Sequence, residues 1–295
     1  MMVDEFLDYL RYEKNRSELT VDSYANDLES FEAYFKGLDD QLTWQSVDTD
    51  VIRDWMEYMM DKGNRATSIN RRLSALRSFF RFALARHLID RDPSRLIKGP
   101  KKSKPLPQFV KEDEMDRLLD DVAWGDSFEE VRTRAILMVF YETGIRLSEL
   151  VGLNETSVDM ETCQIRVLGK RRKMRVIPFG EELRHALYIY NKVRARKVGQ
   201  GSSAFFVTAD GARMNGGQVR YEVRRQLAKV STLHKRSPHV LRHSFATAML
   251  NHDAGLESVK KLLGHASLAT TEIYTHTTFE QLKRVYTKAH PRASL

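Results

Sequence analysis

The chain has 295 residues, of which 42% are hydrophobic and 30% charged, and its formal net charge is +8. This length suits two globular domains better than one core, and the positive balance favours an acidic partner such as nucleic acid. A membrane span, a secretory signal and an internal disulfide framework are excluded, because there is no apolar run of about 18 residues, no apolar segment near the start and a single cysteine. We therefore expect a cytoplasmic protein.

The first third of the chain is predicted to be helical, because apolar residues recur there at helical spacing. The expected helices span residues 3–12, 20–35, 50–60 and 67–87. Residues 1–61 hold five basic and sixteen acidic residues, whereas residues 62–86 hold seven basic residues and no acidic one. This concentration of positive charge favours contact with a polyanion, although a solvated helix face would give the same pattern.

The helix expected at 67–87 carries a polar stripe opposite its apolar face. Asn70, Ser74, Arg77 and Arg81 follow one another at spacings of four, three and four residues, so they share one side of the helix. Side chains of these types can read base edges in a DNA major groove, and the alternative is an ordinary exposed face. The candidate nucleic-acid contacts in this helix are Arg71, Arg72, Arg77 and Arg81.

A basic linker is predicted after this helix. Residues 98–107 contain three Pro, one Gly and four Lys, a composition that cannot hold a regular element. We therefore expect a helical domain at 1–98, a linker at 99–108 and a second domain at 109–295. The linker residues expected to lie across phosphates are Lys101, Lys102 and Lys104.

The second domain is predicted to combine helices with one β-hairpin. The apolar run within 129–142 indicates a deeply buried helix. Strands at 164–168 and 175–179 flank a basic tip, which predicts a hairpin. The candidate nucleic-acid contacts at its tip are Arg171, Arg172 and Lys173. Further helices are expected at 112–122, 181–196, 217–231, 238–251, 256–263 and 279–289.

Two segments place a cationic side chain beside a sharp turn. Arg146 opens a helix shortly after Gly144, where the helix dipole favours an anion. This placement is explained by an anion docked at that point, or by a salt bridge to Glu149 three residues further on. Lys170 at the hairpin tip is placed to protonate a leaving oxygen, and the alternative is a solvated turn.

Two further segments carry histidines and a tyrosine. His239 and Arg242 share one helix face, so both can contact one ligand. His239 and His243 also have the spacing of a zinc pair, but no Glu follows His239 and no third ligand is indicated, so no metal site is predicted. His265 ends a helix in a Leu-Gly-His sequence, and Tyr274 follows nine residues later.

In this order the four segments resemble the tyrosine recombinase (phage integrase-like) family, and within it the bacterial XerC/XerD site-specific recombinases. The resemblance is carried by Thr-Gly-x-Arg-x-Ser-Glu-Leu, His-x-Leu-Arg-His-Ser-Phe-Ala-Thr and Leu-Gly-His-x8-Tyr, and it covers essentially the whole chain. It implies a two-domain, mainly α fold: a helical, SAM-like core-binding domain and a mixed α/β catalytic domain with a small antiparallel sheet. The catalytic residues that it implies are Arg146, Lys170, His239, Arg242, His265 and Tyr274.

The resemblance also implies a mechanism. Tyr274 attacks a DNA phosphate and forms a 3′-phosphotyrosine, while two arginines clamp the phosphate oxygens. Lys170 protonates the leaving 5′-oxygen, His239 accepts the tyrosine proton and His265 donates to the phosphate. No metal, ATP or other cofactor is required.

The implied biological role is Xer-type resolution of chromosome dimers by a cytoplasmic, nucleoid-associated enzyme. The expected partners are a double-stranded recombination site, a second related recombinase in a synaptic tetramer, and a DNA translocase activator. The helix at 279–289 would dock on a neighbouring protomer or fold back on its own domain, and the sequence leaves both open. The rival functions are an integrase or transposon recombinase, a type IB topoisomerase and a non-catalytic DNA-binding module.

The hairpin departs from the Gly-Lys-Gly usual in Xer proteins, because Arg171 replaces the second glycine and Lys173 becomes a rival for Lys170. If Lys170 is the general acid, we expect Lys170→Ala to cut ordinary DNA about 10²–10⁴-fold more slowly. A 5′-phosphorothiolate should largely restore the rate of covalent adduct formation, because sulfur leaves without a proton. Arg146→Ala should not be rescued. Rescue of Lys173→Ala alone would place the catalytic lysine further along the hairpin.

Overall fold

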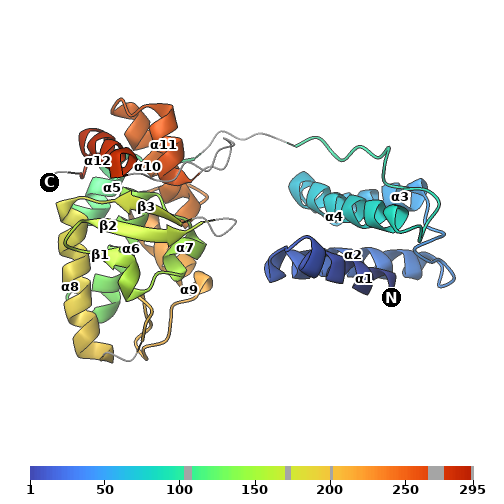
Figure 1. Ribbon diagram of the computed structural model, residues 1–295, viewed down its shortest axis with the longest axis horizontal. Coiled ribbons are helices and arrows are strands. Elements are labelled where there is room, and N and C mark those ends of the chain that lie inside the picture. The colour runs from blue at the N-terminus through green and yellow to red at the C-terminus, as the bar shows by residue number, and fades with distance from the viewer. Residues whose placement is uncertain (103–107, 170–173, 200–201, 265–275, 294–295) are drawn as a thin grey trace. The chain divides into compact units, whose positions relative to one another are not determined.

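The computed structural model describes residues 1–102, 108–169, 174–199, 202–264 and 276–293 (Figure 1). The chain divides into two compact units, Met1–Pro105 and Leu106–Leu295. This division falls within residues 99–108, the predicted linker. Within the described ranges, no helix is both long enough and apolar enough to cross a membrane.

The first unit is a helical domain in which each predicted helix is present. Its helices are α1 (Met2–Asp8), α2 (Glu18–Leu38), α3 (Thr49–Asp61) and α4 (Ala66–Ala85), with a π-helical turn, η1 (Tyr9–Glu13), directly after α1. The Asp48 carboxylate accepts hydrogen bonds from the backbone N–H groups of Asp50 and Val51, so it caps α3 at the N-terminus. The first predicted helix, residues 3–12, therefore corresponds to α1 and η1 together.

Aromatic rings fill the core of the first unit. The Trp44 ring centroid lies 4.5 Å from that of Phe79, and the Phe6 centroid lies 5.5 Å from Phe79. The Trp44 indole N–H donates to Glu32 Oε1 at 3.0 Å, so its polar end is satisfied. Full burial of a ring such as Phe79 contributes about 1.5–3 kcal/mol to the free energy of unfolding. This packing holds α4 in a defined position in the domain.

The second unit is built around one buried helix. Its helices are α5 (Glu112–Asp116), η2 (Arg117–Asp121), α6 (Phe128–Thr143), α7 (Leu147–Val151), η3 (Glu155–Ser157), α8 (Glu181–Val198), α9 (Gly216–Val230), α10 (Pro238–Asn251), α11 (Leu256–Leu263) and α12 (His276–Ala289). Residues 135–143 of α6 are all buried, as the apolar run predicted. The helices α8 and α10 pack on α6, and α10, α11 and α12 group at one end of the unit (Figure 1).

A small antiparallel sheet contains the predicted hairpin. Its strands are β1 (Val158–Asp159), β2 (Gln164–Leu168) and β3 (Met174–Pro178), in the order β1-β2-β3. Leu168 pairs with Met174 at the hairpin end, and the tip at 170–173 lies outside the described residues. Strand β1 was not predicted, because two residues are too few to show alternation.

The C-terminal segment packs on its own domain. In α12, Leu282, Tyr286 and Ala289 are buried. Arg292 follows the helix and forms ion pairs with the three carboxylates of Asp116, Asp120 and Glu182. Of the two placements left open by the sequence, this single chain therefore has the helix folded back on its own domain.

Arg292 is expected to stabilise the second unit. Its side chain is 8% exposed, whereas its carboxylate partners are about half exposed and regain water when the arginine is lost. We expect Arg292→Ala to lower the free energy of unfolding by about 1–3 kcal/mol, measured by urea denaturation. Arg184→Ala, which removes the exposed pair with Glu181, should change it by less than about 0.5 kcal/mol. Equal effects of the two variants would contradict a structural role for Arg292.

Candidate active site

Arg242 is a buried cation on α10. Its Nη1 donates to the Gly144 carbonyl at 2.5 Å, and its Nη2 donates to the Leu263 carbonyl at 2.6 Å. These bonds hold the guanidinium between the end of α6 and the end of α11. A carbonyl oxygen carries no net charge, so the positive charge of Arg242 remains available to an anion.

Arg146 occupies the N-cap position of α7, as predicted. Its backbone N–H donates to Glu149 Oε2 at 2.6 Å, and its Nη1 donates to Glu149 Oε1 at 2.8 Å. The predicted salt bridge to Glu149 is therefore present. Because the Arg146 side chain keeps 27% of its surface exposed, this salt bridge leaves room for an anion as well.

Arg175 is a third arginine of this cluster, which the sequence did not single out. Its Nη1 and Nη2 donate to the two carboxylate oxygens of Glu149 at 2.6 and 2.8 Å. Burial opposes ionisation of Glu149, but hydrogen bonds and charge from Arg175 and then Arg146 outweigh it and lower the pKa of Glu149 to about 2. Strand alternation places Arg175 on the same buried face as Ile177, and a charged residue at such a position indicates a buried partner.

The C-terminal end of α11 joins the three arginines. Three successive carbonyls accept one hydrogen bond each: Leu262 from Arg175 Nε at 3.0 Å, Leu263 from Arg242, and Gly264 from Arg146 Nη2 at 3.0 Å. The carbonyl end of a helix carries partial negative charge, which favours cations there.

Gly264 is required at this helix end for two reasons. It adopts a left-handed conformation with φ of 65°, which favours glycine. A Cβ at this position would also lie only 3.1–3.2 Å from the side chain of Arg175. A larger residue would therefore disturb both the turn and the arginine cluster.

The cluster carries an excess of positive charge. Among the described residues, three guanidinium groups share one carboxylate: Arg146 and Arg175 form ion pairs with Glu149, and the charge of Glu149 also acts on Arg242. Burial, together with repulsion from Arg146 and Arg175, lowers the pKa of Arg242 to about 10. The group remains cationic near neutral pH, and an anion such as a phosphate would relieve the repulsion.

Two histidines face each other beside Arg242 on α10. The Nε2 atoms of His239 and His243 lie 3.2 Å apart, so one of the two must carry the proton between them. Burial, and the nearby His239 and Arg242, lower the pKa of His243. The described ranges contain no group of three or more His, Cys, Asp or Glu side chains that could hold a metal ion.

Seven of the predicted site residues fall outside the part of the chain that the structure describes. Those outside the described residues are Lys104, Lys170, Arg171, Arg172, Lys173, His265 and Tyr274. Of the six predicted catalytic residues, the structure thus describes Arg146, His239 and Arg242. Gly264 precedes His265 directly, and its carbonyl accepts from Arg146, so the described cluster reaches the start of the segment that carries His265 and Tyr274.

Three of the four predicted nucleic-acid contacts on α4 have partners within the described part of the chain. Arg71 forms an ion pair with buried Asp27, with Nη2 to Oδ1 at 2.7 Å, and the Arg72 guanidinium lies 3.9 Å from the same carboxylate. Arg77 donates to the Ile97 carbonyl. Arg81 is exposed, and so are Lys101 and Lys102 in the linker.

The start of the linker lies along the predicted polar stripe. Asn70 Nδ2 donates to the carbonyl of Pro100 at 2.9 Å and to that of Ala66 at 2.7 Å. Together with Arg77 at Ile97, this contact anchors residues 97–100 on α4. Asn70 and Arg77, which the sequence suggested as base-reading residues, therefore have partners within the chain, because the carbonyls of an irregular linker need donors.

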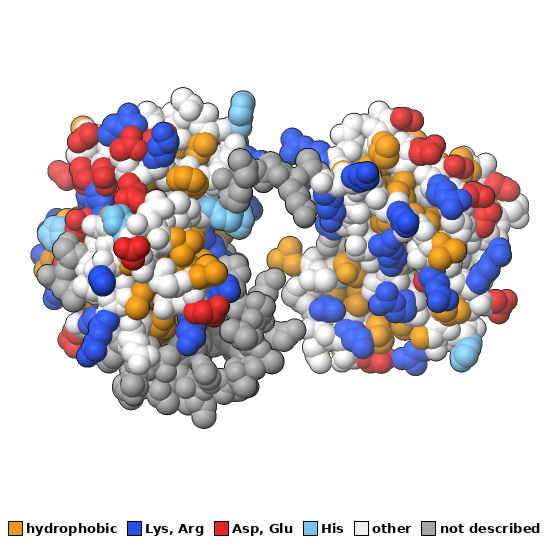
Figure 2. Space-filling model, turned by 90° about the horizontal axis from the view of Figure 1, so that it is seen from above, with side chains coloured by type: hydrophobic (Ala, Val, Ile, Leu, Met, Phe, Trp, Pro, Cys, Tyr) orange, Lys and Arg blue, Asp and Glu red, His pale blue; other side chains and the backbone are white. Residues whose placement is uncertain are grey.

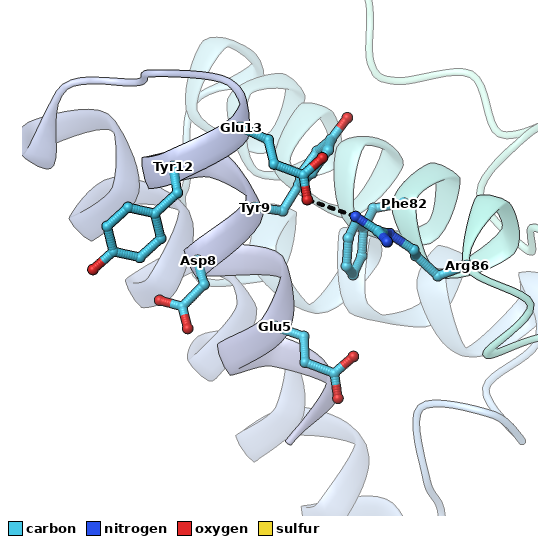
Figure 3. Close-up of a pocket in the computed structure, with 7 residues that line it drawn as sticks. All are labelled: Glu5, Asp8, Tyr9, Tyr12, Glu13, Phe82 and Arg86. Carbon is cyan, nitrogen blue, oxygen red and sulfur yellow. Dashed lines mark hydrogen bonds and ion pairs between the residues drawn. The ribbon is translucent and has the colours of Figure 1, made fainter.

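A shallow pocket on the first unit is mainly acidic, in contrast to the basic helix α4. Figure 3 shows it between the α1–η1 segment and the end of α4, where Arg86 donates to Glu13 at 2.5 Å. Its lining residues are Glu5, Asp8, Tyr9, Tyr12, Glu13, Phe82 and Arg86. Three carboxylates against one guanidinium would repel a phosphate. Lys and Arg side chains gather instead on the face of this unit that Figure 2 shows.

Two family models match the chain. The model described as the phage integrase family matches residues 108–281, and the model described as the phage integrase N-terminal SAM-like domain matches residues 3–87. The two matches fall in the two compact units, one in each. They agree with the predicted fold class, a helical SAM-like domain followed by a mixed α/β catalytic domain.

Individual relatives match over nearly the whole chain. Tyrosine recombinase XerC of Chlorobaculum tepidum is 38% identical, with 98% of this chain and 94% of the relative covered. Tyrosine recombinase XerD of Oceanobacillus iheyensis is 34% identical, with 99% and 98% covered. The crystal structure of XerH recombinase bound to palindromic difH substrate, a post-cleavage complex, matches with a TM-score of 0.72 at 21% identity, covering 97% of this chain and 84% of that chain. This structural likeness concerns the fold.

Arg81 is the predicted DNA contact on α4 that the salt dependence of DNA affinity tests most directly, because its side chain is exposed. If Arg81 touches a DNA phosphate, Arg81→Ala should reduce the slope of log affinity against log salt by about 0.9, because one fewer counterion is released. Arg53→Ala, which removes an exposed arginine paired with Asp50 on α3, serves as the control and should leave the slope unchanged. An unchanged slope for Arg81→Ala as well would show that this face does not touch phosphates.

Proposed function

Since this chain belongs to the phage integrase family, we propose that it is a site-specific tyrosine recombinase that cuts and rejoins duplex DNA through Tyr274. The observation that carries the proposal is the cluster of Arg146, Arg175 and Arg242 at the carbonyl end of α11, where Glu149 is the one carboxylate among the described residues that pairs with any of the three. This cluster is a preformed positive site at the end of α11, whose last residue, Leu263, lies eleven residues before the proposed nucleophile in the sequence.

Arg146 and Arg242 are proposed to bind the scissile phosphate. An arginine has five N–H donors, and the side-chain bonds described for each of these two use two. The remaining donors are available for non-bridging phosphate oxygens. A phosphodiester gains negative charge as it becomes five-coordinate, so cations fixed in advance stabilise the transition state more than the ground state.

The proton transfers are assigned to residues by the family pattern. Tyrosine has an unperturbed pKa of about 10, so Tyr274 needs a proton acceptor to attack near neutral pH. His239 is proposed to accept that proton, and Lys170 is proposed to give one to the leaving 5′-oxygen. His265 is proposed to donate a hydrogen bond to the phosphate. The phosphotyrosine conserves the energy of the broken bond, so rejoining needs no ATP.

The biological role proposed is Xer-type resolution of chromosome dimers. Support comes from the similarity to XerC and XerD proteins over almost the full chain. We infer that the enzyme acts at the nucleoid on a duplex recombination site, in a synaptic tetramer with a second related recombinase. Activation by a DNA translocase is proposed from the Xer resemblance alone.

The assignment of Tyr274 is tested by removing its hydroxyl. We expect Tyr274→Phe to bind DNA with near-normal affinity and to form no covalent adduct on a nicked suicide duplex, because the ring remains and the nucleophilic oxygen is lost. Denaturing gels measure the adduct. Tyr221→Phe, which changes an exposed tyrosine on α9, is the matched control and should react normally. A persistent adduct with Tyr274→Phe would contradict the assignment.

A further inference from the structure

We propose that Arg175 is a positioning residue for DNA strand cleavage, acting on the phosphate through Glu149 and Arg146. This inference rests on the function proposed above and adds a residue outside the predicted catalytic set. It follows from the burial of Arg175 on β3 and from its hydrogen bonds to Glu149 of α7 and to the end of α11.

Arg175 determines the orientation of the Glu149 carboxylate. It donates to both oxygens, at 2.6 and 2.8 Å, and this bidentate geometry defines the plane of the carboxylate. The same two oxygens accept the Nη1 and the backbone N–H of Arg146. A change in the Glu149 plane therefore moves the Arg146 guanidinium, which is the group proposed to touch the phosphate.

Arg175 also anchors the end of α11. Its Nε donates to the Leu262 carbonyl, and its side chain packs against Gly264, whose carbonyl accepts from Arg146. Arg146 is thus bonded to two groups that Arg175 positions: the Glu149 carboxylate and the α11 carbonyl end. Loss of the bidentate Arg175 guanidinium would therefore leave both the Glu149 carboxylate and the end of α11 less well fixed.

Bonding and charge distinguish this role from direct catalysis. All three nitrogens of Arg175 are bonded within the chain, two of them to a carboxylate, whereas the described side-chain bonds of the equally buried Arg242 go to two uncharged carbonyls. The charge of Arg175 is balanced by Glu149 at close range. Arg146 and Arg242 then supply the net positive charge that a phosphorane requires, and Arg175 supplies their geometry.

The test compares Arg175→Lys with a matched buried arginine. Arg175→Ala would leave Glu149 without its principal partner and risks unfolding, whereas Lys keeps the charge and loses the bidentate fork. The control is Arg194→Lys on α8: Arg194 is similarly buried, pairs with Glu155 and donates to two carbonyls, but lies outside the arginine cluster. Both variants should be folded, with a similar loss in melting temperature.

The measured quantities are DNA affinity and the single-turnover rate of adduct formation. The substrate is a nicked suicide duplex carrying the genomic sequence that the wild-type protein binds in cells. We expect Arg175→Lys to bind within a few-fold of wild type and to cut about 10²-fold more slowly, because a displacement of about 1 Å at the reacting centre costs that much. Arg194→Lys should cut at close to the wild-type rate.

A sulfur-substituted substrate separates the two routes by which Arg175 could act. Arg175 lies two residues beyond the hairpin tip that carries Lys170, so it could instead position the general acid. A 5′-phosphorothiolate removes the need for that acid, and it should leave the Arg175→Lys defect in place. Rescue by sulfur would overturn the route through Arg146.

Other results also overturn the inference. A folded Arg175→Lys that cuts at the wild-type rate would do so, and so would a defect confined to DNA affinity. A rate loss in Arg194→Lys as large as that in Arg175→Lys would mean that lost stability alone slows cleavage. Failure of the wild-type protein to form any adduct would instead overturn the proposed function, and is therefore distinguishable from failure of this inference.

Discussion

The second unit depends on one unfavourable arrangement, three arginines held against the carbonyl end of a single short helix. Like charges at close range repel, and the desolvation of Arg242 adds to the cost. Three factors offset this: the carbonyls of residues 262–264, the Glu149 carboxylate, and a packed core centred on α6. A positive site assembled during folding has no need to reorganise when an anion binds, and such preorganisation is a large source of transition-state stabilisation in enzymes.

The first unit uses its arginines differently. Arg71 neutralises buried Asp27, and Arg77 holds the linker backbone, so part of the positive charge on α4 maintains the domain itself. The first unit thus carries both a surface rich in Lys and Arg, shown in Figure 2, and the acidic pocket of Figure 3. Of these two features, the basic surface is the one whose charge suits a polyanion.

Most helices and the hairpin could be predicted from the sequence, because their signals are local. A continuous apolar run indicated α6, and the spacing of Arg146 and Glu149 indicated their salt bridge. Arg175 was missed because its carboxylate partner lies 26 residues away. The α11 carbonyls were missed because backbone acceptors have no side-chain signature, and Asn70 was interpreted as a base contact because its partner lies 30 residues along the chain.

The anchoring of residues 97–100 on α4 has a consequence for avidity. If both units bind one duplex, binding of the first unit raises the effective concentration of the second unit at the DNA. That effective concentration depends on the length and stiffness of the chain that connects the two units. Each residue held against α4 by Asn70 and Arg77 removes freedom from that connection and fixes the direction in which it leaves the unit. If both units bind the same duplex, amide and guanidinium groups that need not touch DNA thereby contribute to the affinity.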